Sequence, residues 1–286
     1  MTSRRAVGFS ALVALTAVWG TSFPAIKVVV REIGFLHYVV FRFAISTFLL
    51  APVAVTRLRQ LKSYVASGLA LGLLYLAGIS LQGWGMEYTS ASNAAFVTGL
   101  SVVFVYVFET FLGREKASTQ LASAIVLALI GLYLMSFTGS ELRIMLGDVI
   151  VLAGSVCWAL QIMVVDRFAK GDLLSLLFFE SLFTTVGATA FIPLVGFPDY
   201  QALETALPSL VYLSTACTIG ANALQLYGQR WISSVEAAFI YLLEPVFAAV
   251  FSFIALGETM SQLQALGAAA ILSAMSISTL KGRRSS

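Results

Sequence analysis

The sequence is poor in the residue types on which most catalytic and metal sites depend. It contains one histidine, His37, and only 11% of its residues are charged. A single histidine excludes sites built from two or more histidines, such as the H-E-x-x-H zinc motif. The chain has no Gly-Lys pair and therefore no Walker A loop, and it has no G-x-S-x-G elbow. We expect neither a metal nor a cofactor, no nucleic-acid partner, and a protein that is not an enzyme.

The thiol and acidic groups that are present stand alone. Cys157 and Cys217 each lie inside an apolar run, which argues against a disulfide framework. The few aspartates are scattered singly along the chain, so no site with paired carboxylates for a metal is predicted.

Apolar residues, by contrast, dominate the sequence. They make up 59% of the chain, and its mean hydropathy is +0.92. A soluble domain of this composition would have too little polar surface to cover its core. The sequence therefore predicts a multi-pass protein of the lipid bilayer. The first apolar run resembles a signal peptide, but it continues to about residue 30 without an A-x-A-like cleavage site, so we interpret it as a retained helix.

Ten apolar runs are long enough to cross a hydrocarbon core of roughly 30 Å. They lie near 7–29, 35–56, 64–85, 91–112, 119–137, 147–166, 173–195, 207–227, 234–256 and 262–280. Nearly all lysines and arginines of the connections fall on one side of the predicted membrane, and only Arg31 and Arg143 on the other. This bias marks the cytoplasmic side. The predicted fold class is all-α and integral to the membrane, with ten transmembrane helices and both termini in the cytoplasm.

The second half of the sequence resembles the first. Residues 81–118 align with residues 224–261, with identical pairs that include Gln82/Gln225 and Gly85/Gly228. We predict two five-helix units, 1–138 and 145–286. Because five is an odd number, the second unit enters the membrane from the opposite side, which is the inverted-repeat architecture of many secondary transporters.

Three stretches carry a resemblance to a known family. The "WGTSF" of the first run, the "YTSASNAAF" that opens the fourth and the "EPVFAAVFSFIALGE" of the ninth resemble EamA-type members of the drug/metabolite transporter superfamily. The resemblance implies ten helices, a central cavity between the halves and export of amino acids or related metabolites. Within the superfamily the chain looks most like aromatic amino acid exporters. It departs from the pattern at Val102, which stands opposite Pro245, so it is open whether both units bend alike.

The ninth run places Glu244 and Pro245 near the middle of the membrane. A carboxylate at this depth costs at least about 2.5 kcal/mol on insertion scales. Pro245 cannot donate to the carbonyl of Tyr241, four residues earlier. The freed carbonyl and the carboxylate make a polar spot that would bind the amino group of a substrate. Two alternatives stay open: a protonated Glu244 that carries a proton, and a carboxylate that pairs with a basic or hydroxyl group to fix the helix bend.

Polar side chains form similar stripes on two further runs. Tyr75 and Gln82 share one face of the third run, and Thr218, Asn222 and Gln225 occupy the corresponding face of the eighth. We interpret Tyr75, Gln82, Asn222 and Gln225 as cavity wall. The alternative is hydrogen bonding between helices, worth about 0.6 kcal/mol per pair in membranes.

Two tryptophans lie within runs rather than in the interfacial belts where tryptophan is normally enriched. Trp19 and Trp158 occupy similar positions in the two units, with Ser22 and Gln161 one turn away. They would stack on aromatic substrates in a pocket, or they would pack at the junction of the units. The predicted substrate-binding residues are thus Trp19, Ser22, Tyr75, Gln82, Trp158, Gln161, Asn222, Gln225, Tyr241 and Glu244.

Other residues are assigned supporting roles. Pro24 and Pro245 are candidate bending points. Arg42 and Glu180 each lie within two turns of the end of a run, so we expect their charged groups to reach the interface. Lys27 would meet a substrate carboxylate or anchor the interface.

These observations favour a secondary transporter or facilitator that exports amino acids with an aromatic bias, by alternating access through a central cavity. Efflux of lipophilic cations is the alternative, and a membrane-embedded enzyme is a weaker one. The resemblance and the charge pattern imply a bacterial inner membrane. We expect a small-molecule substrate and a monomer or homodimer.

Overall fold

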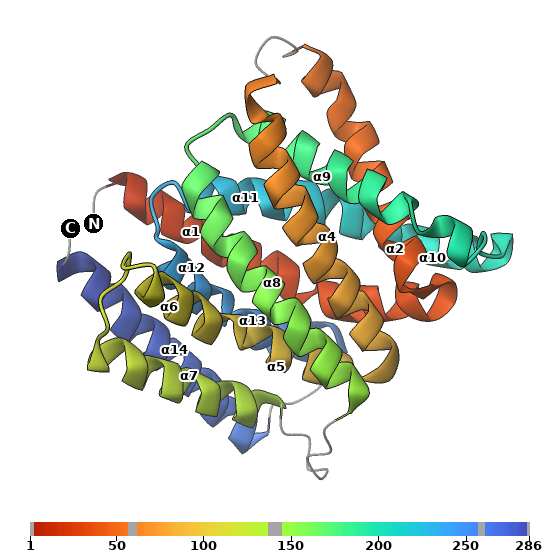
Figure 1. The fold of residues 1–286 in the computed structure, drawn as a ribbon. Helices are drawn as coiled ribbons and strands as arrows, with labels where there is room; N and C mark the ends of the chain where they lie inside the picture. Colours follow the sequence, from red (N-terminus) through yellow and green to blue (C-terminus); the bar gives the residue numbers. More distant parts are fainter. Residues whose placement is uncertain (1–2, 57–61, 137–144, 257–260, 285–286) are drawn as a thin grey trace.

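We describe the chain from a computed structural model, which covers residues 3–56, 62–136, 145–256 and 261–284. All regular elements in these ranges are helices (Figure 1). They are α1 (Ser3–Gly20), α2 (Ser22–Val55), η1 (Lys62–Tyr64), α4 (Val65–Tyr88), α5 (Ala91–Gly99), α6 (Ser101–Phe111), α7 (Thr119–Ser136), α8 (Leu146–Phe168), α9 (Leu173–Thr189), η2 (Ile192–Leu194), α10 (Tyr200–Ser214), η3 (Thr215–Gly220), α11 (Ala221–Gly228), α12 (Ser234–Tyr241), α13 (Glu244–Leu256) and α14 (Gln262–Arg284).

Several helical stretches have the length and composition of membrane spans. Within the described ranges six are long and apolar enough to cross a bilayer, and two shorter apolar helices, Thr119–Met135 and Leu173–Thr189, accompany them. The six are Ser3–Pro52, Lys62–Tyr88, Asn93–Phe111, Leu146–Phe168, Tyr200–Gly228 and Ser234–Phe251. The all-helical membrane class is as predicted, and the count of ten crossings stays a prediction.

The 50-residue stretch from Ser3 to Pro52 changes direction at Gly34. Gly34 has φ 75° and ψ 161°, a conformation that residues with a side chain rarely adopt. The next amide, that of Phe35, donates to Oε1 of Glu87 at 3.1 Å instead of to its own helix. The part of α2 before Gly34 therefore completes the first predicted run, which begins in α1, and the part after Gly34 is the second run, joined to it without a loop.

Two further helices are interrupted at matching positions. The fourth run breaks at Leu100, between α5 and α6, and the ninth breaks at Leu242 and Leu243, between α12 and α13. At each break the amide donates to a carbonyl three residues back, Leu100 to Val97 at 3.1 Å and Leu243 to Ile240 at 3.0 Å. The fourth and ninth runs thus break at aligned positions, although the fourth has no proline there.

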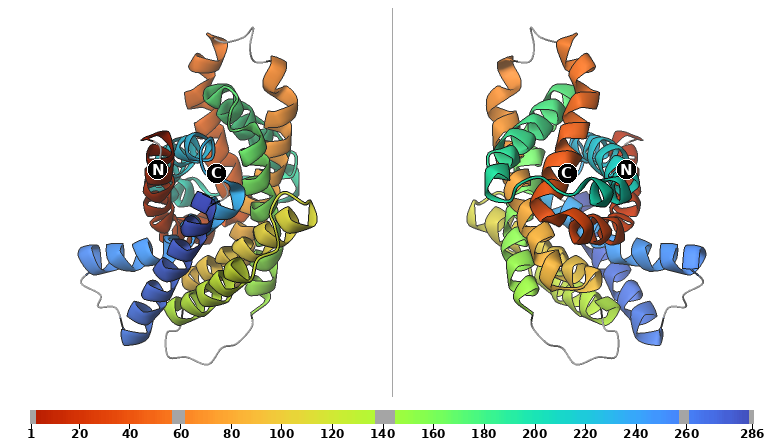
Figure 2. Two further views of the ribbon diagram at one scale, coloured as in Figure 1. Left: turned by 90° about the vertical axis from the view of Figure 1, so that its left-hand side faces the viewer. Right: turned by 90° about the vertical axis from the view of Figure 1, so that its right-hand side faces the viewer.

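Helices from the first half of the chain pack against helices from the second half. α4 packs on α8 and α11 on α1, α2 packs on α9, and α7 packs on α14 (Figures 1 and 2). The α7–α14 pair is close because glycines face each other. A Cβ on Gly131 would lie 2.8 Å from the carbonyl oxygen of Gly267, and one on Gly267 would lie 2.6 Å from that of Gly131. Small residues let transmembrane backbones approach in this way.

Candidate substrate cavity

A cavity in the middle of the molecule is bordered by nine helices, α1, α2, α4, α5, α6, α8, α11, α12 and α13. Its volume is about 70 Å³, enough for several water molecules. Nine of the ten predicted substrate-binding residues line it: Trp19, Ser22, Tyr75, Gln82, Trp158, Gln161, Gln225, Tyr241 and Glu244. Residues far apart in the sequence are thus brought to one place.

Aromatic rings form two edge-to-face pairs on the cavity wall. The ring centroids of Trp19 and Tyr241 lie 5.5 Å apart, and those of Tyr75 and Trp158 lie 4.8 Å apart. Nε1 of Trp19 donates to the carbonyl oxygen of Cys217 at 3.1 Å. Nε1 of Trp158 is buried and has no partner among the described residues. An unpaired buried donor is costly, so Trp158 has a hydrogen bond to offer to a molecule in the cavity.

Amides supply neutral polar groups to the same wall. Gln161 and Gln225 exchange hydrogen bonds of 3.2 and 3.1 Å. Nε2 of Gln82 donates to Oγ1 of Thr98 at 3.2 Å. These bonds link α8 to α11 and α4 to α5, so each glutamine both holds helices together and faces the cavity.

Glu244 is the first residue of α13 and the only acid among the described residues that line the cavity. No hydrogen bond or ion pair joins its carboxylate to any described side chain. The helix break before Glu244 turns its side chain inward, and close contact with Gly20 of α1 holds its backbone in place: a Cβ on Gly20 would lie 2.8 Å from the Glu244 carbonyl oxygen. Pro245 follows as the second residue of α13, where a missing amide costs no helical bond.

Asn222 is buried beside the cavity without lining it. Its Oδ1 accepts a 3.3 Å bond from the hydroxyl of Tyr75, and its Nδ2 donates to Oε1 of Glu180 at 2.5 Å. Asn222 thus links helices. Glu180 is 1% exposed, so the prediction that its carboxylate reaches the interface is wrong.

Arg42 is the second charge for which the interfacial prediction is wrong. It is 2% exposed and lines the cavity. The position of Arg42 along the run could not show that it has hydrogen-bond partners inside the protein. Its three hydrogen-bond acceptors, on α2 and η3, draw the guanidinium inward.

Pro24 has a different position from the one predicted for a bending point. It is exposed in the first turn of α2, and the chain breaks before it, at Thr21. The amide and the hydroxyl of Thr21 both donate to the carbonyl of Val18, at 3.2 and 2.7 Å. The break therefore arises at Thr21 and leaves Trp19 and Ser22 on either side of it, both facing the cavity.

Comparison of the sequence with known protein families shows the family to which this chain belongs. The family of EamA-like transporters matches residues 6–137 and 145–280. The chain belongs to the EamA-like transporter family. It is therefore a multi-pass membrane transporter with a small-molecule substrate.

Two relatives of this EamA transporter span nearly all of it, and a third spans about three quarters. An uncharacterized transporter of Archaeoglobus fulgidus is 27% identical over 273 residues, which are 95% of this chain and 84% of the relative. A second from the same organism is 26% identical over 281 residues, 94% and 96% of the two chains. The uncharacterized transporter YyaM of Bacillus subtilis is 26% identical over 225 residues, 74% and 72% of the two. These names agree with the expectation that the chain is not an enzyme.

A solved structure shares the fold of this EamA transporter. The crystal structure of a protein that is 18% identical in sequence superposes with a TM-score of 0.77, covering 99% of each chain. At that identity the likeness concerns the fold alone.

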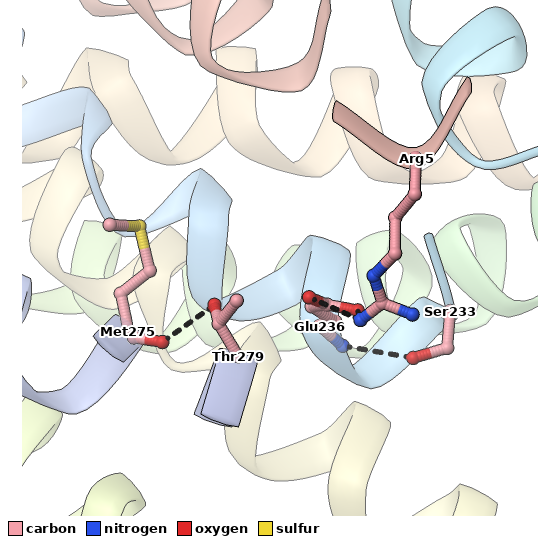
Figure 3. Close-up of polar contacts among 5 residues, drawn as sticks. All are labelled: Arg5, Ser233, Glu236, Met275 and Thr279. Atoms are coloured by element: carbon pink, nitrogen blue, oxygen red, sulfur yellow. Dashed lines mark hydrogen bonds and ion pairs between the residues drawn. The ribbon is translucent and has the colours of Figure 1, made fainter. Parts of the chain in front are cut away.

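Charged side chains outside the cavity join helices of the EamA transporter. Figure 3 shows Arg5 of α1 at the start of α12, where Nη2 donates to the two carboxylate oxygens of Glu236 at 2.9 and 2.6 Å. Ser233 caps α12 by accepting the amide of Glu236 at 3.3 Å. At another helix end, Nζ of Lys27 donates to the carbonyls of Met86 and Thr89. Lys27 is thus a structural anchor that does not line the central cavity.

Proposed function

We propose that this EamA transporter is a secondary transporter or facilitator that exports amino acids, with a bias toward aromatic ones, by alternating access. The observation that carries the proposal is the central cavity, in which two aromatic pairs stand beside a carboxylate without a described partner. Aromatic rings would contact an aromatic side chain, and Glu244 would bind the amino group. We also propose the bacterial inner membrane, ten crossings in two inverted five-helix units, and cytoplasmic termini.

The helix breaks support a mechanism in which the halves rearrange around the cavity. Discontinuous transmembrane helices surround the substrate sites of several inverted-repeat transporters. Here the chain is interrupted at Thr21, at Leu100 and at Leu242, and residues on both sides of each break line the cavity. Rotation at these breaks would expose the cavity to one side of the membrane and then to the other.

The test is counterflow of labelled phenylalanine and tryptophan into liposomes that contain the purified protein, with and without a pH gradient. We expect saturable uptake of both. Uptake that ignores the gradient indicates a facilitator, and uptake that the gradient drives makes Glu244 the first proton-carrier candidate. No uptake of either amino acid would contradict the aromatic assignment.

Efflux of lipophilic cations is the second candidate, favoured by the same acid and rings. A quaternary ammonium ion is attracted to aromatic faces as well as to a carboxylate. Expression of the protein in a sensitive bacterial strain, followed by growth in quaternary ammonium compounds, separates the two: resistance without amino acid counterflow supports the cation.

A further inference from the structure

Arg42 places a positive charge deep in a membrane protein. It lies in α2 beyond Gly34, is 2% exposed, and is the only basic residue among the described residues that line the cavity. Charged side chains inside a membrane are costly and mark functional sites by default. The charge therefore calls for a physical reason.

Neutral groups hold the guanidinium in place. Nε donates to Oγ1 of Thr218 at 2.7 Å, Nη1 donates to the hydroxyl of Tyr38, and Nη2 donates to the carbonyl oxygen of Cys217 at 3.1 Å. Cys217 and Thr218 belong to η3, a π-helix, in which Oγ1 of Thr218 donates to the carbonyl of Leu213, five residues back. π-helical turns of this kind are frequent at functional sites.

These contacts orient Arg42 without neutralising it. Its Cζ lies 5.7 Å from the ring centre of Tyr38 and 5.6 Å from that of Phe43. No carboxylate among the described residues forms an ion pair with it, and the buried carboxylate of Glu180 is bonded to Asn222 instead. A guanidinium has five N–H donors, and the three bonds above leave two of them free.

A purely structural role is a weak explanation, because α2 is already joined beside Arg42 to the end of α10, which leads directly into η3. Oγ of Ser46, one turn further along α2, donates to the carbonyl of Ser214 at 2.9 Å. A hydroxyl makes that link at much smaller desolvation cost than a guanidinium.

We propose that Arg42 binds the carboxylate of the transported substrate. The inference rests on the proposed function and narrows it: the cargo carries a carboxylate for Arg42 and an amino group for Glu244, the one cation and the one acid of the described cavity lining. Arginine suits this task because its planar fork matches a carboxylate. The site therefore selects α-amino acids over amines and acids that have the same ring.

The first test uses the wild-type protein, so that it does not depend on the folding of a variant. Counterflow of labelled phenylalanine is competed with phenylalanine, with phenethylamine, which lacks the carboxylate, and with 3-phenylpropanoate, which lacks the amine. We expect phenethylamine to compete at least about tenfold more weakly than phenylalanine, since a hydrogen-bonded charge pair is lost. If phenethylamine competed as strongly as phenylalanine, the proposal would be overturned.

The second test locates the effect at Arg42. Arg42→Gln should remove the preference for phenylalanine over phenethylamine. Arg42→Lys should keep part of it, because lysine retains the positive charge but lacks the planar guanidinium that matches a carboxylate. Arg31→Gln is the matched control, since Arg31 is exposed on the same helix. An Arg42→Gln protein that transports phenylalanine with unchanged preference would contradict the proposal.

A failure of the proposed function gives a different result. If the wild-type protein moves neither phenylalanine nor tryptophan, the aromatic assignment is wrong. Arg42 is then tested by thermal stabilisation of the purified protein with other amino acids and with the amines that lack their carboxylates. Stabilisation by amino acids alone, lost in Arg42→Gln, supports the carboxylate site, and equal stabilisation by the amines overturns it.

Discussion

Glu244 and Asn222 show two fates of a polar side chain in the same core. The carboxylate of Glu244 faces the cavity with no described partner, whereas the side-chain amide of Asn222 is hydrogen-bonded to Tyr75 and Glu180. Their sequence patterns did not separate them, because both were polar residues within apolar runs. Arg42 was missed for a related reason: its position along a run could not reveal its three hydrogen-bond acceptors inside the protein.

Replacement of Glu244 by glutamine tests the residue that the proposed function needs most. We expect Glu244→Gln to reduce phenylalanine counterflow by about tenfold or more, because a hydrogen bond to a charged group contributes about 1.5–3 kcal/mol. Glu204→Gln, on the exposed side of α10, is the control. Full activity in a Glu244→Gln protein that elutes as a single folded species would refute the role.

Asn222 is expected to matter for stability. Asn222→Ala removes the donor to Glu180 and should lower the free energy of unfolding by about 1–3 kcal/mol, seen as a lower melting temperature in detergent. Because the destabilisation comes from leaving the buried Glu180 carboxylate without its donor, it should be smaller in a Glu180→Gln background. Additive effects of the two substitutions would show that the pair does not act together.

At the scale of the helices, the length of the apolar runs predicted where most helices lie, but it did not predict where they break. Pro245 was the signal used for a bend, yet the equivalent helix breaks at Leu100 with no proline nearby. The π-helix Thr215–Gly220 and the turn at Gly34 likewise arise from packing and from a single glycine conformation. Local sequence carries little information about either.

The paired breaks make a prediction about Pro245. If packing rather than proline sets the break, Pro245→Ala should leave phenylalanine counterflow close to the wild-type rate. The measurement is the initial rate in liposomes at equal protein density. A loss as large as that of Glu244→Gln would mean that the proline itself is needed.

For the whole molecule, the family and the membrane class followed from composition and from short motifs spread over the chain. The inverted duplication stays a prediction, although the helix pairs α4–α8 and α1–α11 are what it leads one to expect. The sequence could not indicate contacts between residues far apart in the chain, such as that of Arg5 with Glu236.

The Arg5–Glu236 ion pair is expected to help close the end at which α1 and α12 begin. Glu236 precedes Tyr241 by five residues, or about 7.5 Å along a helix, so the pair lies between that end and the cavity. Arg5→Gln should therefore speed the labelling of a Ser22→Cys protein, in a background without Cys157 and Cys217, by a thiol reagent added from that end. Arg4→Gln is the control, since Arg4 lies over the ring of Trp231 and forms no ion pair with a described residue. Equal labelling rates would show that the pair does not limit access.

The carbonyl oxygen of Cys217 accepts both Nε1 of Trp19 and Nη2 of Arg42, and this has a consequence for how position 217 varies. The acceptor is a main-chain oxygen, so an amino-acid substitution at position 217 leaves it in place. A saturation mutagenesis screen should find alanine or serine at 217 nearly neutral, while large residues fail for lack of room, since the side chain is fully buried. We therefore expect homologues to carry different small residues at this position while the carbonyl keeps both hydrogen bonds.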